Sequence, residues 1–262
     1  MKIGFYDSGL GGIKTLKDII GMGLKEEIYF LADEKNKPYG TKSAEEVKKL
    51  ASENVQKLVN IGCKIIVVAC NTATSVAIKD LRQEFPNIQI IGTEPAVKLA
   101  IKENLNKKVL IIATTITING EKLHKLILDL HATQNIELLA TDKLVTLIED
   151  ENFLNNQQEV NNYLEKILQP YNLDEFSHII LGCTHFPLLK NNIEEILKNK
   201  QKNVKVIDGN EGIGRNLLNK INESNEKHDE LNLTIMTTRQ DQAFSKRAKQ
   251  ILKDIKYKEI EI

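Results

Sequence analysis

The sequence predicts an α/β fold in which helices cover parallel sheets, arranged as two facing halves. Short apolar runs alternate with helical patterns along most of the 262 residues, which is typical of parallel α/β layers. Two of these runs end at a cysteine in nearly matching settings, at Cys70 and Cys183, as if one unit were presented twice. Because open α/β sheets bind ligands outside the carboxyl ends of their strands, we expect a cleft between the halves that brings the thiols together.

The predicted strands are short apolar runs, and helical patterns fill the gaps between them. We expect strands over residues 2–6, 28–31, 64–69, 88–91, 109–113, 136–139, 178–181, 204–207 and 231–236. The clearest helix follows Ser43, because Glu46 stands at capping-box spacing and apolar residues recur at helical periodicity from Val47. The polar stretch 223–230 indicates an exposed loop or helix end. No proline-rich or serine-rich linker divides the chain, so a second domain would be inserted through short crossings.

The composition is that of an ordinary globular protein, with 41% apolar and 27% charged residues. Lysine plus arginine and aspartate plus glutamate both count 36, so the chain has no net positive charge that would attract nucleic acid. No apolar stretch fits a signal peptide or a membrane span, and we expect a cytoplasmic protein with no membrane partner. Three cysteines are too few for a disulfide framework, so reduced thiols are expected.

A glycine-rich turn, DSGLGG over residues 7–12, follows the first predicted strand. Such a turn can direct backbone N–H groups at an anion near a helix N-terminus, or it can be merely a tight connection. A P-loop is excluded because Ile13 separates the glycines from Lys14 and because Asp7 would repel a phosphate. Asp7 and Ser8 favour a ligand site, since they stand at the carboxyl end of the strand.

A second turn, Pro38-Tyr39-Gly40, follows a loop over 33–37 whose charges indicate a surface location. Proline and glycine here need only shape the turn, which is the ordinary interpretation. The functional alternative is that the N–H groups of Tyr39 and Gly40, with the tyrosine hydroxyl, meet a substrate carboxylate.

Cys70 and Cys63 differ in their neighbouring residues. A buried structural thiol is the default for free cysteine, and Cys63 fits it because no polar partners surround it. Cys70 is followed by Asn71 and Thr72 at the expected start of a helix. A helix N-terminus lowers the pKa of a thiol below its usual value of about 8.5, so a reactive thiolate is expected at Cys70.

Cys183 has a similar setting, with Thr184 and His185 directly after it and Pro187 within an expected first helical turn. His185 can cap its helix or pack beneath the sheet, which is the commoner use of a lone histidine. Two residues from a thiol, it is also a candidate for tuning that thiol or for moving a proton.

Two thiols in equivalent settings suit an enzyme that inverts a carbon centre through a planar carbanion. Such an enzyme needs a base on one face of the carbon and an acid on the other. Zinc is a weak alternative, since no Cys-x-x-Cys pair is present and Asp7 would have to complete the ligand set. A Cys-His hydrolase leaves the second thiol unexplained.

Two further polar groups have open roles. Thr114 and Thr117 follow a predicted strand, where they can cap the next helix or bind a carboxylate at its start. Glu149 is expected on a solvated acidic face, with an electrostatic role in the cleft as the alternative.

Taken together, four motifs resemble the signature set of bacterial glutamate racemases, within the aspartate/glutamate racemase superfamily. They are DSGLGG at 7–12, PYG at 38–40, CNTA at 70–73 and GCTHFP at 182–187. The segment from Thr237 to Ala248 also looks like the closing strand and helix of that family. The order and spacing match along nearly the whole chain.

The resemblance implies two pseudo-symmetric α/β domains, 1–93 plus 208–262 and 94–207, with the active site between them. It implies interconversion of L-glutamate and D-glutamate for peptidoglycan, with no metal or other cofactor. Cys70 would act on D-glutamate with the help of Asp7. Cys183 would act on L-glutamate with the help of His185 and Glu149.

The resemblance also implies which residues bind glutamate. The α-carboxylate and ammonium group would be met by Asn71, Thr72, Thr117 and Thr184, and the side-chain carboxylate by Ser8, Tyr39 and Gly40. Asp7, Pro38, Thr114 and His185 complete the expected substrate-binding set. Glutamate is the expected partner, and a homodimer is left open.

The sequence departs from the family pattern at two positions, and two rival functions are also considered. Asn36 stands where many members carry an arginine, and Thr146 stands where a proline is common, which affects the expected positioning of Glu149. The rival functions are a racemase for aspartate or another amino acid and a non-catalytic amino-acid sensor on the same fold.

Overall fold

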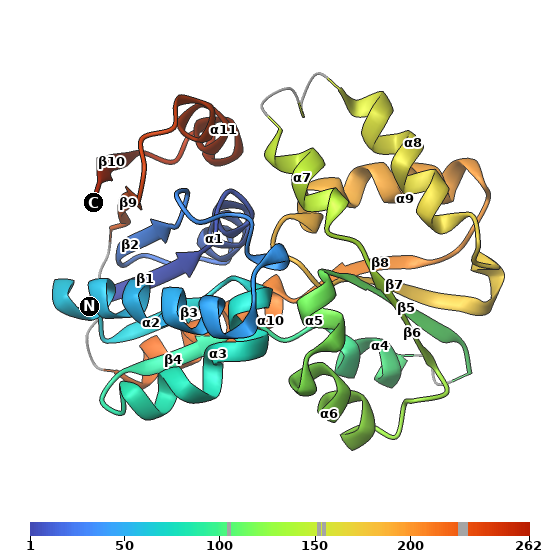
Figure 1. The fold of residues 1–262 in the computed structure, drawn as a ribbon, viewed down its shortest axis with the longest axis horizontal. Coiled ribbons are helices and arrows are strands. Elements are labelled where there is room, and N and C mark those ends of the chain that lie inside the picture. Colours follow the sequence, from blue (N-terminus) through green and yellow to red (C-terminus); the bar gives the residue numbers. More distant parts are fainter. Residues whose placement is uncertain (104–105, 151–152, 154–155, 225–229) are drawn as a thin grey trace. The chain divides into compact units, whose positions relative to one another are not determined.

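The computed structural model describes residues 1–262 except 104–105, 151–152, 154–155 and 225–229. The chain divides into two compact units (Figure 1). Unit 1 comprises Met1–Glu94 and Asn210–Ile262, and unit 2 comprises Pro95–Gly209. Each unit is built around its own parallel sheet, so the predicted α/β fold class is confirmed.

Unit 1 contains a six-stranded sheet in the order β10-β9-β2-β1-β3-β4. Its strands are β1 Lys2–Asp7, β2 Glu27–Ala32, β3 Ile65–Val68, β4 Gln89–Gly92, β9 Asn232–Thr237 and β10 Tyr257–Glu261, and all pairs are parallel. Its helices are α1 Gly11–Gly21, α2 Ala44–Ile61, α3 Asn71–Glu84, α10 Asn210–Glu223 and α11 Gln242–Leu252, with a 3-10 turn at Tyr39–Thr41. Helix α2 packs against α3, and α1 packs against α10 and α11. The central strand β1 is therefore buried along nearly its whole length, as expected for a sheet covered on both faces.

Unit 2 contains a four-stranded sheet in the order β6-β5-β7-β8. Its strands are β5 Lys108–Ala113, β6 Ile136–Ala140, β7 Phe176–Leu181 and β8 Lys205–Asp208, again all parallel. Its helices are α4 Val97–Glu103, α5 Thr115–Asn119, α6 Glu121–Asp129, α7 Lys143–Glu149, α8 Gln157–Leu168 and α9 Lys190–Asn199, with 3-10 turns at Leu173–Glu175 and Phe186–Leu189.

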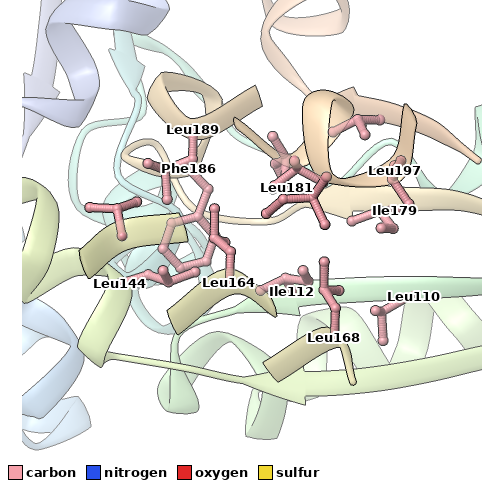
Figure 2. Close-up of a cluster of buried hydrophobic side chains, with 14 of the residues drawn as sticks. Leu110, Ile112, Leu144, Leu164, Leu168, Ile179, Leu181, Phe186, Leu189 and Leu197 are labelled. Atoms are coloured by element: carbon pink, nitrogen blue, oxygen red, sulfur yellow. The ribbon is translucent and has the colours of Figure 1, made fainter. Parts of the chain in front are cut away.

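The core of unit 2 has two parts because strand side chains alternate between faces. Leu110 and Ile112 of β5 belong to one cluster, whereas Val109 and Ile111 belong to the other. Figure 2 shows the first cluster, in which leucines from the helices meet β5 and β7. The labelled helical members are Leu144, Leu164, Leu168 and Leu197. This packing holds the carboxyl ends of β5 and β7 beside each other.

The predicted strands all occur, within a few residues of their expected ends. Ser43 is the N-cap of α2, where its side chain accepts a hydrogen bond from the N–H of Glu46, as predicted. The last strand, β10, was not predicted. Of the polar stretch 223–230, Glu223 ends α10, and 225–229 lie outside the described residues. Within the described parts of the chain, every helix is too short or too polar to cross a membrane.

Candidate active site

Asp7 closes the glycine-rich turn that follows β1. It is fully buried, and its Oδ1 accepts hydrogen bonds from the N–H groups of Gly9 and Gly12, both at 3.0 Å. A Cβ atom on Gly12 would lie 2.3 Å from the Cβ atom of Asp7, so only glycine fits here. Of the two alternatives for this turn, the tight connection therefore applies to Gly9 and Gly12, whose N–H groups bind Asp7 rather than an external anion.

Cys70 is the N-cap of α3, two residues beyond β3. Its Sγ accepts a hydrogen bond from the N–H of Ala73 at 3.4 Å and lies 3.7 Å from the Oγ of Ser8. The residue is buried, with 3% of its surface exposed, and Asn71 and Thr72 begin the helix. The predicted helix start behind this thiol is confirmed. Because a helix N-terminus stabilises negative charge, the position suits a thiolate.

Cys183 follows β7 as Cys70 follows β3. In each unit, the residue before the cysteine donates its backbone N–H to a carbonyl oxygen of the neighbouring strand, at 2.8 Å. The two donor–acceptor pairs are Ala69 with Tyr6 and Gly182 with Ile112. The near-matching sequence settings thus correspond to matching positions at the carboxyl end of each sheet.

His185 lies between Cys183 and Glu149. Its Nδ1 is 3.7 Å from the Sγ of Cys183, and its Nε2 is 2.5 Å from the Oε1 of Glu149. Burial of the ring would by itself lower the pKa of His185. The hydrogen bonds to Cys183 and Glu149 and the charge of the Glu149 carboxylate outweigh burial, so the pKa of His185 is raised well above its usual value.

Glu149 does not lie on a solvated face. Its side chain is 11% exposed and is directed to His185 from the last residue of α7. The ordinary interpretation of this acidic segment is therefore wrong at Glu149, and its neighbour Glu151 lies outside the described residues. His185, although it is the N-cap of the 3-10 turn Phe186–Leu189, makes no side-chain capping bond, which excludes the capping role.

Thr114 caps α5 at the carboxyl end of β5. Its Oγ1 accepts a hydrogen bond from the N–H of Thr117 at 3.4 Å, and the two hydroxyl oxygens are 2.9 Å apart. The predicted capping role is confirmed. Thr184 is buried beside Cys183, and Ser8 is buried beside Asp7.

The loop before Tyr39 is only partly on the surface, where Lys35 is exposed. Asp33 is fully buried and Glu34 is 2% exposed, which contradicts the expectation drawn from their charges. The hydroxyl of Tyr39 donates to Asp33 Oδ2 and accepts from the hydroxyl of Tyr6, both at 2.6 Å. The functional alternative for this hydroxyl is therefore not supported, because the hydroxyl is hydrogen-bonded inside unit 1.

The sequence analysis did not single out three polar side chains that are joined by hydrogen bonds at this loop. They are Asp33, which begins the loop, and its partners Asn54 and Thr238. One signal was available, since Asp33 stands at the carboxyl end of β2 as Asp7 stands at the end of β1.

The predicted site residues divide between the units. Unit 1 brings together Asp7, Ser8, Pro38, Tyr39, Gly40, Cys70, Asn71 and Thr72. Unit 2 brings together Thr114, Thr117, Glu149, Cys183, Thr184 and His185. Each group lies beyond the carboxyl ends of the strands of its own sheet, with one thiol in each.

The sequence is similar to those of known racemases. The model of the family described as Asp/Glu/Hydantoin racemase matches residues 23–212. A glutamate racemase of Campylobacter concisus is 44% identical over 223 residues, covering 84% of this chain and 83% of that protein. One of Clostridium botulinum, strain Langeland, is 41% identical over 243 residues, covering 91% and 92%.

The fold is also similar to solved structures. Glutamate racemase RacE1 of Bacillus anthracis matches with a TM-score of 0.87 at 30% identity, over 99% of this chain and 96% of that one. The Francisella tularensis glutamate racemase in complex with D-glutamate matches with a TM-score of 0.81 at 25% identity, over 100% and 97%. The family match over most of the chain and these full-length similarities agree with the paired thiol sites, and the chain belongs to the Asp/Glu/Hydantoin racemase family.

Proposed function

We propose that this chain is a glutamate racemase, which interconverts L-glutamate and D-glutamate without a cofactor and uses Cys70 and Cys183 as its two bases. Relatives at 44% and 41% identity bear that name, and a similar structure holds D-glutamate. The two-base assignment rests on the matching positions of the thiols, each two residues beyond a central strand of its own sheet. The D-glutamate product serves peptidoglycan synthesis.

The proposal requires each of the two units to contribute groups to the reaction. Each supplies a thiol with its own polar partners, which is what an inversion at one carbon requires if the thiols face opposite sides of it. All three cysteines are reduced thiols, and such thiols persist in the cytoplasm, where we place the reaction.

The reaction is a proton exchange at the α-carbon. One thiolate removes the α-proton while the electrons of the C–H bond stay on the carbon, and the opposite thiol gives its proton to the other face. Cys70 removes the proton of D-glutamate and Cys183 that of L-glutamate, so each returns a proton when the other is the base. Because the α-proton is weakly acidic, hydrogen-bond donors at the carboxylate must stabilise the developing charge.

The two thiols receive different assistance. Asp7 assists Cys70 from the neighbouring strand end. His185 assists Cys183, and Glu149 orients its ring through the bond of 2.5 Å. The raised pKa of His185 keeps the imidazolium form to higher pH, and its positive charge favours the thiolate at Cys183.

Glutamate is held at both of its ends. The groups proposed for the α-carboxylate and ammonium are Asn71, Thr72, Thr117 and Thr184, with Asp7, Thr114 and His185 alongside. Ser8 and the turn Pro38-Tyr39-Gly40 meet the side-chain carboxylate. At Tyr39 the contact uses the backbone, because its hydroxyl is engaged within unit 1.

Racemisation in deuterium oxide tests the proposal. Starting from L-glutamate, the D-glutamate formed early should carry deuterium at the α-carbon, while the remaining L-glutamate keeps protium, because each thiol delivers its own solvent-exchanged proton. Mass spectrometry of the separated enantiomers measures this. Retention of the original hydrogen in most of the product would point to a single base.

Three matched variants assign the bases. Cys70→Ser and Cys183→Ser should each lower kcat by about 10²-fold or more, the usual contribution of a positioned acid or base. Cys63→Ser should stay near wild type, because Cys63 is 1% exposed at the opposite end of β3 and burial raises its pKa to about 12. Near-normal turnover of either of the first two variants would remove that cysteine from the mechanism.

A further inference from the structure

We propose that Asp33 is a positioning residue, whose buried carboxylate fixes the turn Pro38-Tyr39-Gly40 where it meets the side-chain carboxylate of glutamate. The inference rests on the proposed function and deepens it. It assigns a role to a buried carboxylate that the sequence analysis did not single out.

Asp33 accepts hydrogen bonds from four side chains. The hydroxyl of Tyr39 donates to Oδ2 at 2.6 Å, and the amide of Asn54 donates to the same oxygen at 3.1 Å. The hydroxyl of Thr238 donates to Oδ1 at 2.8 Å. The amide nitrogen of Asn36 reaches both oxygens, at 2.9 and 3.1 Å. Hydrogen bonds to an ionised acceptor are shorter and stronger than neutral ones, so this fully buried carboxylate is a strong anchor.

The donors come from three separate segments of unit 1. Asn36 and Tyr39 belong to the loop after β2, whereas Asn54 lies within α2 and Thr238 lies just beyond β9. Thr238 also accepts a hydrogen bond from the N–H of Lys35 at 3.0 Å. Asp33 therefore joins the loop to a helix on one side and a strand end on the other.

Tyr39 transmits this anchoring to the turn. Its ring is buried with 2% of the residue exposed and packs edge-on against the ring of Tyr6, at 6.3 Å between centroids. Burial, and then the neighbouring Tyr6 and Asp33, raise the pKa of Tyr39 well above its usual value, so its hydroxyl remains a donor to Asp33. With the ring held at its far end, the backbone of Tyr39 and Gly40 is fixed in direction.

Asn54 is a polar residue at a buried position of α2 that would otherwise be expected to hold an apolar side chain. It is 2% exposed and lies among the buried positions of α2, where Ala51, Val55 and Leu58 are apolar. A buried amide is costly unless it is hydrogen-bonded, and Asn54 bonds both Asp33 and, at 3.4 Å, the hydroxyl of Tyr39.

The test is steady-state kinetics on Asp33→Asn and Tyr39→Phe, with folding checked by thermal melting. Asp33→Asn keeps the shape but turns one acceptor into a donor that opposes the donors around it. It should raise KM for both enantiomers of glutamate about tenfold or more and lower kcat much less. Tyr39→Phe keeps the ring, removes the hydroxyl that bonds Asp33, Tyr6 and Asn54, and should shift KM in the same direction. In the double variant the two effects should be less than additive.

A matched pair on α2 supplies the control. Asn54→Ala should raise KM. Gln56→Ala should not, because it removes only an exposed hydrogen bond from the Gln56 side-chain amide to Asn60 on the same helix. If Asp33→Asn fails to fold, Tyr39→Phe and Asn54→Ala decide the question.

A purely structural role for Asp33 predicts a lower melting temperature with an unchanged KM in the folded fraction. Wild-type KM in the folded variants would overturn the inference while leaving the proposed function intact. Absence of glutamate racemisation by the wild-type chain would overturn the proposed function itself.

Discussion

The imidazole of His185 is held at both nitrogens. Nδ1 faces the thiol of Cys183 at 3.7 Å and Nε2 faces the carboxylate of Glu149 at 2.5 Å. A neutral imidazole has one N–H donor, whereas imidazolium has two. The two contacts therefore favour the charged ring, in agreement with its raised pKa.

Replacing Glu149 by glutamine should narrow the pH range of activity. Without the carboxylate, its hydrogen bond and its charge no longer raise the pKa of His185, so that pKa falls and the imidazolium is lost at lower pH. The descending limb of the profile of kcat/KM against pH should move to lower pH. This shift should be the same for the L-to-D and the D-to-L reaction. The two enantiomers have equal free energy, so kcat/KM must stay equal for them.

The control is Glu103→Gln, which removes a carboxylate 3.2 Å from the Nε2 of the other buried histidine of unit 2, His178. It should leave the activity profile in place. An unshifted profile in Glu149→Gln would show that the charge of His185 does not govern turnover.

The predicted solvent exposure was wrong at two charged residues. Asp33 and Glu149 were assigned to solvated segments, since isolated carboxylates are rarely buried. Asp33 is buried and the Glu149 side chain is 11% exposed, and each has a partner from a distant part of the chain: Thr238 is 205 residues from Asp33, and His185 is 36 residues from Glu149. Cys70, Cys183 and Asp7 were recognisable because their signals are local, in a strand end followed by a helix start.

At the scale of elements, β1 and α1 approach each other too closely for any side chain at Gly12. Its missing Cβ would lie 2.3 Å from the Cβ of Asp7 and 2.9 Å from the ring of Phe30 in β2. The close approach is what lets the first turn of α1 bind the Asp7 carboxylate. The position of this catalytic candidate is therefore a property of strand and helix together.

Gly12→Ala should displace Asp7, with a fall in racemase activity of more than tenfold and a loss of about 1–3 kcal/mol of stability from overpacking. Gly21→Ala at the other end of α1 is the control, because a Cβ there meets nothing within 4 Å. It should be neutral or stabilise by up to about 1 kcal/mol through helix propensity. Activity assays with denaturant unfolding measure both. Wild-type behaviour of Gly12→Ala would contradict this account of the turn.

The predicted strands share one property that β10 lacks. They are apolar runs, and central strands such as β3 and β5 are buried along almost all of their length. In β10 only Tyr257 is partly buried and the rest is exposed, because the strand is at the sheet edge and pairs with β9 alone. Its sequence, YKEIE, therefore contains no burial pattern from which it could be predicted.

At the scale of the molecule, the duplication seen in the sequence is a duplication of position. Each unit has a parallel sheet with a cysteine two residues beyond a central strand, and each cysteine has its own polar neighbours. Local patterns predicted both units. How the two units meet depends on contacts between residues far apart in the sequence, which no local pattern encodes.

If the two units of one chain close on one glutamate, both thiols of a site come from the same chain. Mixing Cys70→Ser with Cys183→Ser should then leave racemase activity at the sum of the two separate variants, since no site in the mixture has both thiols. The mixture should be incubated long enough for subunits to exchange, and size-exclusion chromatography with light scattering should accompany it. Recovery of about a quarter or more of wild-type activity, as mass action on exchanging pairs allows, would show instead that a site is assembled from two copies. An unmixed variant that recovers alone would exclude exchange as the cause.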